Sequence, residues 1–248
     1  MKMLEGKNII ITGARRGIGK TTVEVFAANG ANIWACARKY DEIFEADMAD
    51  LSGKYGVIIQ PVYFDTTDEV QIKNAIMEIR KTKRPIDALI NIAGLVEDST
   101  SFTMTAMEKM RKVFEVNFFG LTLLTQYVSR LMIRQNRGSI VNISSIAGID
   151  GTPAQYEYAS SKAAVIGGVR QLARELAQYN IRVNAVAPGI VDTEMGGHIK
   201  QELKDSVLAS VMMGRVAQPE EISNVCMFLA SDLSSYMTGQ IIRVDGGM

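Results

Sequence analysis

Short runs rich in β-branched residues alternate along the chain with longer segments in which apolar positions recur every three to four residues. The short runs predict strands and the longer segments predict amphipathic helices. Such an alternation is typical of a parallel sheet covered by helices on both faces, which here means a doubly wound α/β fold of the Rossmann type. The predicted strands are 8–12, 32–37, 57–63, 88–92, 139–143, 182–187 and 240–244. The predicted helices are 20–29, 70–81, 104–135, 156–178 and 219–230.

No linker, repeat or low-complexity tract interrupts this alternation, so a single domain over 1–248 is predicted. The segment 193–215 is the longest stretch that we leave outside the pattern, and it contains glycines together with Met195, Met212 and Met213. We expect it to close over a substrate. The alternative is an ordinary pair of surface helices whose methionines fill gaps in the core.

The composition excludes several classes of function. Lys+Arg and Asp+Glu both number 27 in 248 residues, so no global field favours nucleic acid or an anionic membrane. No signal peptide and no run of about 18 apolar residues is present, which predicts a soluble cytoplasmic protein. Cys36 and Cys226 are expected to be buried free thiols, and with the single His198 they match no metal-ligand spacing.

A glycine-rich turn, TGARRGIG at 12–19, follows the first predicted strand and precedes the first predicted helix. In that context backbone N–H groups and a helix N-terminus can face a pyrophosphate. Glycine is needed wherever a Cβ would block the approach of the phosphates. Three spaced glycines are a weak signal alone, but their position between a strand and a helix predicts a dinucleotide site. The expected contacts are Gly13, Arg15, Arg16, Gly17, Ile18 and Gly19.

Tyr158 is the only one of the eight tyrosines that is followed four residues later by a lysine, Lys162. In a helix over 155–178 the phenol and the ammonium would share one face. A nearby cation favours the phenolate and lowers a pKa that is about 10 in water. Tyr158 is therefore predicted to exchange a proton near neutral pH. The alternative is a solvated pair on an ordinary helix face.

The end of the second predicted strand bears on the choice of cofactor. NAD-selective sites place an acidic residue there to hold the ribose 2′-hydroxyl, whereas this chain has Arg38 and Lys39. With Arg15 or Arg16, Arg38 could hold a 2′-phosphate through charge-assisted hydrogen bonds. NADP(H) is predicted over NAD(H), and the alternative is that Arg38 and Lys39 are solvated loop charges.

With Ser145 thirteen residues before Tyr158, these motifs resemble those of the short-chain dehydrogenase/reductase family. The likeness runs from the first predicted strand to the C-terminus. One departure is Ile92, where the family usually has a second asparagine, and we expect a local packing change there without loss of cofactor binding. The further matching segments are 91–94 (NIAG), 116–120 (VNFFG), 188–193 (PGIVDT) and 245–247 (DGG).

The resemblance implies a role for each matching residue. Tyr158 would protonate a carbonyl oxygen whose carbon receives hydride from NADPH, and Ser145 would hydrogen-bond the same oxygen. Lys162 would lower the phenol pKa and hold the nicotinamide ribose, and Asn117 would position a water that links Lys162 to solvent. The implied substrate contacts are Ser145, Gln155 and Tyr158. The remaining implied cofactor contacts are Asp65 at the adenine, Asn91, Ala93, Gly94, Pro188, Gly189 and Ile190, and Thr193 at the carboxamide.

Two residues compete with this assignment. Ser144 precedes Ser145, but alternation along a strand end would point the two hydroxyls in opposite directions. Tyr156 lies close to Tyr158 but lacks the lysine one turn later. The family spacing also favours Ser145.

Within the family the resemblance is to bacterial 3-oxoacyl-[acyl-carrier-protein] reductases, through 214–217 (GRVA), 220–222 (EEI), 228–232 (FLASD) and 236–240 (YMTGQ). It implies NADPH-dependent reduction of a 3-oxoacyl thioester in fatty acid biosynthesis. One alternative is a dehydrogenase of another secondary alcohol or ketone, such as a sugar, a steroid or a small metabolite. Another is a cofactor-sensing or scaffolding protein, although such proteins often lose part of the catalytic set that is complete here.

Partners follow from the same resemblance. An acyl carrier protein presents an acidic helix, so a docking surface should be locally basic. Arg130 and Arg134 near Arg137, and Arg170 and Arg174 on the next helix, are the candidates. The alternative is a set of solvated faces paired with neighbouring acids such as Glu175. A homotetramer is expected, since 104–135 and 156–178 are apolar on more than one face.

Overall fold

The computed structural model describes residues 2–193 and 208–248. The seven named strands form one sheet in the order β3-β2-β1-β4-β5-β6-β7, and every neighbouring pair is parallel. The order reverses direction between β1 and β4, which is the point where ligands bind in open sheets of this kind. The strands are β1 (Asn8–Thr12), β2 (Asn32–Ala37), β3 (Ile59–Tyr63), β4 (Ala88–Asn91), β5 (Gly138–Ile143), β6 (Ile181–Pro188) and β7 (Ile241–Val244).

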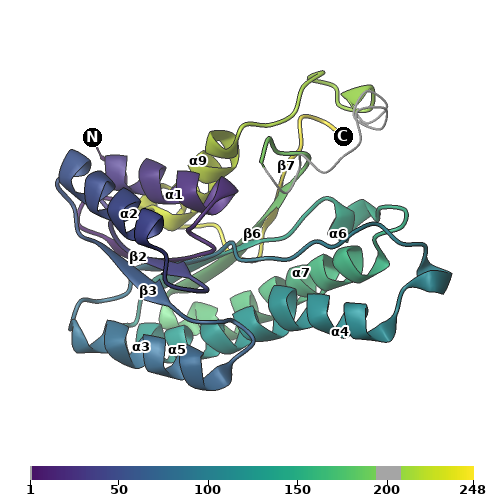
Figure 1. The fold of residues 1–248 in the computed structure, drawn as a ribbon. Helices are drawn as coiled ribbons and strands as arrows, with labels where there is room; N and C mark the ends of the chain where they lie inside the picture. The colour runs from purple at the N-terminus through teal and green to yellow at the C-terminus, as the bar shows by residue number, and fades with distance from the viewer. Residues whose placement is uncertain (1, 194–207) are drawn as a thin grey trace.

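Helices cover both faces of the sheet (Figure 1). One layer holds α1 (Gly17–Ala28), α2 (Glu42–Tyr55) and α9 (Pro219–Ala230). The other holds α3 (Glu69–Lys81), α5 (Gly120–Gln135) and α7 (Tyr156–Leu176). The shorter helices are α4 (Met107–Phe114) and α6 (Ala147–Asp150), with 3₁₀ turns at Phe102–Met104, Ala177–Tyr179 and Asp232–Ser234.

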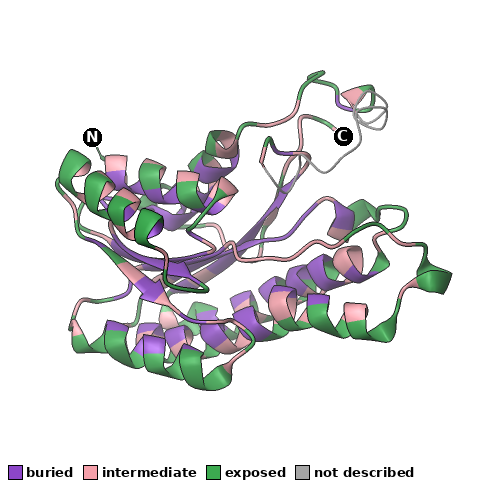
Figure 2. Cartoon of the chain, viewed as in Figure 1, coloured by how far each residue is buried: buried purple, intermediate pink, exposed green. Residues whose placement is uncertain are grey.

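The core consists of two apolar clusters, one on each face of the sheet (Figure 2). Strand β1 shows the principle, because Ile9 and Ile11 belong to the cluster under α1 and α9 while Ile10 belongs to the opposite one. Successive side chains of a strand point to opposite faces, so a strand covered on both sides is apolar throughout. This is why short apolar runs identified the strands.

The predicted α/β architecture is confirmed, and the ends of the strands differ from the predicted ones by at most two residues. The helices differ more from the prediction, because the short α6 was not predicted and α1 begins three residues before its predicted start. Helix α2 was missed, although Asp41 caps it by accepting a hydrogen bond from the Phe44 N–H at 2.9 Å and Gly56 ends it with φ +66°. The predicted helix over 104–135 is interrupted by a π-helical turn, Glu115–Phe119.

Most of the predicted substrate-covering segment, 194–207, lies outside the described residues, and so does His198. Its end is described, and there the Met213 N–H donates to the Gly246 carbonyl at 3.1 Å. No helix among the residues that the structure describes is long and apolar enough to cross a membrane. Within the same residues no group of His, Cys, Asp or Glu side chains could hold a metal ion, and both cysteines are buried free thiols.

Candidate active site

Ser145, Tyr158 and Lys162 meet at the carboxyl end of the sheet. Ser145 lies two residues beyond β5, and Tyr158 and Lys162 lie on one face of α7, as the four-residue spacing predicted. The side chains of Ser145 and Tyr158 are hydrogen-bonded to each other. The Lys162 Nζ lies 5.7 Å from the centroid of the Tyr158 ring. The structure therefore brings together the three groups that the sequence singled out.

The two neighbouring serines point in different directions, as predicted from the alternation along a strand. Ser144 is buried, and its Oγ donates to the backbone carbonyl of Lys162 at 2.9 Å. The Ser144 hydroxyl thus fastens the end of β5 to α7. The Ser145 Oγ faces Tyr158 and accepts a hydrogen bond from the Ala147 N–H at 3.1 Å. Only Ser145 is placed to contact a group at the Tyr158 hydroxyl.

Lys162 is buried, with 3 % of its surface exposed, and its Nζ donates to the Ile143 carbonyl at 2.9 Å. Burial lowers the pKa of this ammonium from 10.5 to about 8, because the charged form loses its hydration. A lysine has three N–H donors, and among the described residues only Ile143 accepts from this one. The remaining donors fit a ligand with hydroxyl groups.

The pKa of Tyr158 is raised, because burial disfavours the phenolate more strongly than the Ser145 hydrogen bond favours it. The prediction that Lys162 lowers this pKa is therefore wrong for the protein alone. The physical reason is that the same burial removes water from the phenol, and the Nζ donates to the Ile143 carbonyl. At neutral pH Tyr158 therefore keeps its phenolic proton.

Asn117 lies in the middle of the π-helical turn between α4 and α5 and is fully buried. Its Oδ1 accepts from the Leu95 N–H at 2.7 Å, and its Nδ2 donates to the Leu95 carbonyl at 2.9 Å and to the Ser161 Oγ at 3.0 Å. A Cβ on Gly94 would lie 3.4 Å from the Lys162 Nζ and 3.5 Å from the Asn117 Oδ1. The π-helical turn therefore carries Asn117 to the reactive end of the sheet, as such turns often do.

The glycine turn forms a cradle between β1 and α1. Gly13 and Gly17 have φ of +68° and +51°, which favour glycine. A Cβ on Gly13 would lie 3.0 Å from Ala93, and one on Gly19 only 1.9 Å from the Gly13 carbonyl oxygen. Because the backbone is exposed without side chains in front of the N-terminus of α1, the cradle fits the pyrophosphate of a dinucleotide. Arg16 precedes the helix, and Ile18 is half-buried in its first turn.

Thr12 was not assigned to the site from the sequence. Its Oγ accepts hydrogen bonds from the N–H groups of Ile92 at 2.9 Å and of Ala93 at 3.1 Å. The last residue of β1 thus holds the segment after β4 against Gly13. Ile92 occupies the position where a second asparagine is usual in the family. The segment is still held by the hydrogen bonds from the Ile92 and Ala93 N–H groups to Thr12.

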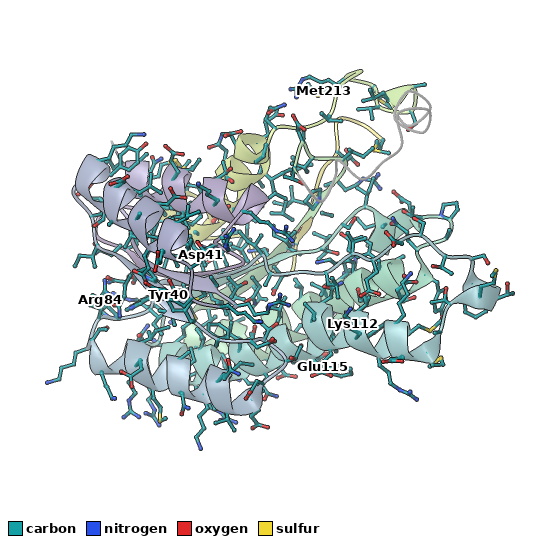
Figure 3. All side chains as sticks on the ribbon, viewed as in Figure 1. Tyr40, Asp41, Arg84, Lys112, Glu115 and Met213 are labelled. Carbon is teal, nitrogen blue, oxygen red and sulfur yellow. The ribbon has the colours of Figure 1, made fainter. Side chains whose placement is uncertain are left out.

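A cavity of about 280 Å³ lies beside the glycine turn and is lined by Arg15, Arg16, Lys20 and Asp41 among others. Arg38 is exposed at the end of β2 and forms no ion pair within the part of the chain that the structure describes. Arg15 instead pairs with Asp41, with 3.0 Å between its Nε and the Asp41 Oδ2. Sequence reasoning overlooked Asp41, which follows β2 by four residues and lies at the start of α2 (Figure 3). This carboxylate faces the cations expected to bind a 2′-phosphate.

Of the other predicted cofactor contacts, Thr193 lies at the glycine turn, whereas Asp65 and Asn91 are hydrogen-bonded to residues of the protein. Thr193 lies against the glycine turn, since its Cγ2 would be 3.3 Å from a Cβ on Gly17. Asp65 accepts from the N–H and Oγ of Thr67, at 2.9 Å and 2.8 Å. Asn91 is buried, and its Nδ2 donates to the Thr125 Oγ and the Asn142 Oδ1 between β4, β5 and α5.

The end of β6 lies beside Ser145. The Pro188 carbonyl accepts from the Ile146 N–H at 3.1 Å, and the Gly189 N–H donates to the Val244 carbonyl at 3.0 Å. The Ile190 carbonyl accepts from the Ala217 N–H at 2.9 Å. These bonds place the predicted segment 188–190 between Ser145 and β7. Gln155, the predicted substrate contact, is the half-buried residue before α7.

Comparisons with known proteins identify relatives that match nearly the whole chain. Residues 13–248 match a family model described as enoyl-(acyl carrier protein) reductase. A 3-oxoacyl-[acyl-carrier-protein] reductase of Thermotoga maritima is 42% identical over 99% of this chain and 98% of its own. A 3α-hydroxysteroid dehydrogenase of Mediterraneibacter gnavus is 37% identical over 98% of this chain and 97% of its own.

Among solved structures, a short-chain type dehydrogenase/reductase of Mycobacterium ulcerans superposes with a TM-score of 0.94 at 28% identity. The match covers 98% of this chain and 90% of that one. The family model, the near full-length identity and the superposition all indicate the same family. This chain belongs to the short-chain dehydrogenase/reductase family.

Proposed function

We propose that this oxidoreductase reduces a 3-oxoacyl thioester, carried by an acyl carrier protein, to the 3-hydroxyacyl form with NADPH. The observation that carries the proposal is the Ser145–Tyr158 hydrogen bond beside the buried Lys162. The identity to the Thermotoga maritima reductase, which extends over nearly the whole of both chains, supports the substrate class.

When bound, a nicotinamide cofactor would supply the hydride, and the residues of this chain would position the ketone and handle the proton. Tyr158, protonated at neutral pH because burial raises its pKa, gives its proton to the ketone oxygen as that oxygen gains negative charge. The Ser145 Oγ donates a hydrogen bond to the same oxygen, which stabilises developing charge in a site with little water. Lys162 would hold the ribose hydroxyls with the donors that Ile143 leaves unused, while Asn117 fixes the backbone of Leu95 beside it.

The test is the loss of NADPH absorbance with an acetoacetyl thioester. Tyr158→Phe should retain NADPH binding and lose at least roughly 10²-fold in turnover, since a positioned acid contributes that much. Tyr156→Phe is the matched control, because this half-exposed tyrosine lies two residues away on the same helix. Near-normal turnover by Tyr158→Phe would refute the assignment.

We further propose NADP(H) as the cofactor, held at its 2′-phosphate by Arg38 with Arg15 or Arg16. Arg38 is exposed and unpaired among the described residues, and the cavity at the glycine turn is lined by Arg15 and Arg16. Kinetics with NADPH and NADH should show a preference in the wild type that Arg38→Asp removes. An equal preference in both proteins would contradict the proposal.

The acyl carrier protein is proposed to dock on the outer faces of α5 and α7. Arg130, Arg134, Arg170 and Arg174 are exposed there, and within the described part of the chain none of them forms an ion pair. Glu175 accepts from Gln171 instead, at 2.7 Å. Arg130→Glu with Arg174→Glu should raise the KM for the carrier-bound substrate and leave that for a pantetheine thioester unchanged. Equal effects on both substrates would argue against docking.

A second function is favoured by one observation, the 37% identity to a 3α-hydroxysteroid dehydrogenase. The same Ser145, Tyr158 and Lys162 chemistry would serve any ketone that fits against these three side chains. A panel of thioesters, steroids, sugars and small ketones separates the two functions. Activity on steroids, sugars or small ketones without activity on thioesters would select the second function. The homotetramer and the cytoplasmic location stay predictions, the first measurable by light scattering of the purified protein.

A further inference from the structure

A buried ion pair lies directly beside the proposed proton donor. Glu157 precedes Tyr158 in the first turn of α7, and its Oε1 lies 3.0 Å from the Nζ of Lys109 on α4. Their side chains are only 2 % and 15 % exposed, respectively. The second carboxylate oxygen, Oε2, is buried and has no hydrogen-bond partner among the residues described. Burying such a pair costs hydration that its attraction repays only in part, so packing alone does not account for it.

Lys109 does more than neutralise Glu157. Its Nζ also donates to the backbone carbonyl of Asp98 and to the Oγ of Thr100, the latter at 3.0 Å. The Thr100 N–H in turn donates to the Ala154 carbonyl at 2.9 Å, just before α7. One ammonium therefore joins the loop after β4 to the start of the helix that carries Tyr158.

The opposite end of the same loop is also fixed. Asn117 binds both backbone groups of Leu95, and Gly94 approaches the Nζ of Lys162. The loop from Leu95 to Thr100 thus runs from the surroundings of Lys162 to Lys109 and Glu157. Because α4 supplies Lys109 and the π-helical turn that follows it supplies Asn117, this part of the chain holds the loop at both ends.

We propose that Lys109 and Glu157 are positioning residues that fix this loop against the first turn of α7 and thereby hold Tyr158 in its reactive geometry. The inference rests on the proposed function, since it assigns the pair a part in the same proton transfer. Neither side chain touches the reacting atoms. The pair acts through the position of the loop and of the helix start, where a displacement of about 1 Å can cost 10²-fold in rate.

The first measurement is kinetic. Lys109→Met and Glu157→Gln should each lower kcat at least roughly tenfold and leave the Kd for NADPH, measured by fluorescence, within about twofold of wild type. The double variant should lose no more than the more impaired single variant, because the two residues act as one unit. Lys109→Arg, which keeps a cation with several donors, should recover most of the rate.

The matched control is Lys112→Met. Lys112 lies on the same helix (Figure 3). It pairs with Glu97 of the same loop, but its side chain is 61 % exposed. An exposed pair contributes little, so Lys112→Met should keep the wild-type kcat. A loss in Lys112→Met equal to that in Lys109→Met would overturn the proposal, because any disturbance of the loop would then suffice.

Hydrogen exchange keeps the proposal falsifiable if a variant is unstable or if another ketone proves to be the substrate. In Lys109→Met the Thr100 amide should exchange faster while amides of β5 keep wild-type protection. The rates are then measured with whichever ketone the wild type reduces, so failure on thioesters alone contradicts only the proposed function. Wild-type kcat in a folded Lys109→Met, additive losses in the double variant, or unchanged exchange at Thr100 would each overturn the proposal.

Discussion

Replacing Lys162 with methionine should stabilise the fold while it abolishes turnover. Lys162 is buried, and burial lowers its pKa from 10.5 to about 8. At neutral pH the folded protein therefore holds a cation that the unfolded chain would hydrate more favourably. Methionine has similar length and no charge, so it fills the same space without that penalty.

The magnitude follows from the two pKa values. A pKa of about 8 in the folded state against 10.5 in the unfolded state corresponds to a penalty of about 3 kcal/mol at pH 7. Methionine also leaves the Ile143 carbonyl without its donor, which costs about 1–2 kcal/mol. The net gain in the free energy of unfolding is then about 1–2 kcal/mol. For a chain of this size that corresponds to roughly 2–8 °C in Tm.

The pH dependence of this contribution to the free energy of unfolding is opposite to that of a lysine whose pKa is raised by a partner. Because the folded pKa lies below the unfolded one, the penalty is fully present below about pH 8 and disappears as the pH approaches 10.5. Between pH 7 and pH 9.5 the wild type should therefore gain about 2 kcal/mol relative to Lys162→Met. Other titrating groups cancel in this difference, which makes the pH dependence the sharper measurement.

The assay is urea denaturation of wild type, Lys162→Met and the exposed control Lys112→Met at both pH values. The control should differ little from wild type at both pH values, since an exposed pair contributes little to stability. The reasoning is refuted if Lys162→Met is less stable than wild type by the same amount at pH 7 and pH 9.5. That result would mean that the buried ammonium is fully compensated by its surroundings.

Three further substitutions test the cofactor end. Gly19→Ala places a Cβ 1.9 Å from the Gly13 carbonyl oxygen, so NADPH binding should weaken more than tenfold in a fluorescence titration. Unchanged binding would contradict the proposal that the glycine turn holds the pyrophosphate. Asp41→Asn keeps a good cap for α2 and frees Arg15, so calorimetry should show NADPH binding roughly two- to fivefold tighter while NADH binding is unchanged. Thr12→Val leaves two amides without their acceptor and should cost about 1–3 kcal/mol in urea denaturation, whereas Thr12→Ser should not.

The strands were predictable because a parallel sheet covered on both faces needs strands that are apolar throughout. Strand β2, Asn32–Ala37, has the predicted bounds for this reason. Helix α9, Pro219–Ala230, has the predicted bounds because a proline opens it. Helix α2 was missed because it buries only Phe44 and Met48, so its apolar period is weak. Its ends carried the signal instead, in the Asp41 cap and in Gly56.

The proximity of Ser145, Tyr158 and Lys162 was predictable from spacing, because four residues on a helix and the end of a neighbouring strand fix which side chains meet. What spacing could not supply were the contacts between distant segments. The π-helical turn that carries Asn117, the Asp41 carboxylate beside Arg15 and the Lys109–Glu157 pair each depend on tertiary packing. The solvation of the site belongs to the same class, since the sequence shows a cation near a phenol but not how much water either one loses.

The loss of water from the site sets the protonation states of Tyr158 and Lys162, and these determine how reduction and oxidation depend on pH. Burial moves Tyr158 toward the neutral phenol and Lys162 toward the neutral amine. A protonated phenol suits reduction, in which the ketone oxygen takes up a proton, whereas oxidation of the alcohol needs the phenolate. The kcat/KM for reduction should hence be level below pH 8 and fall above it as Lys162 loses its proton, while the oxidation rate should rise from pH 6 to pH 8. Reduction that accelerates steadily from pH 7 to pH 10 would show that the ammonium is not needed and that the phenol is not the donor.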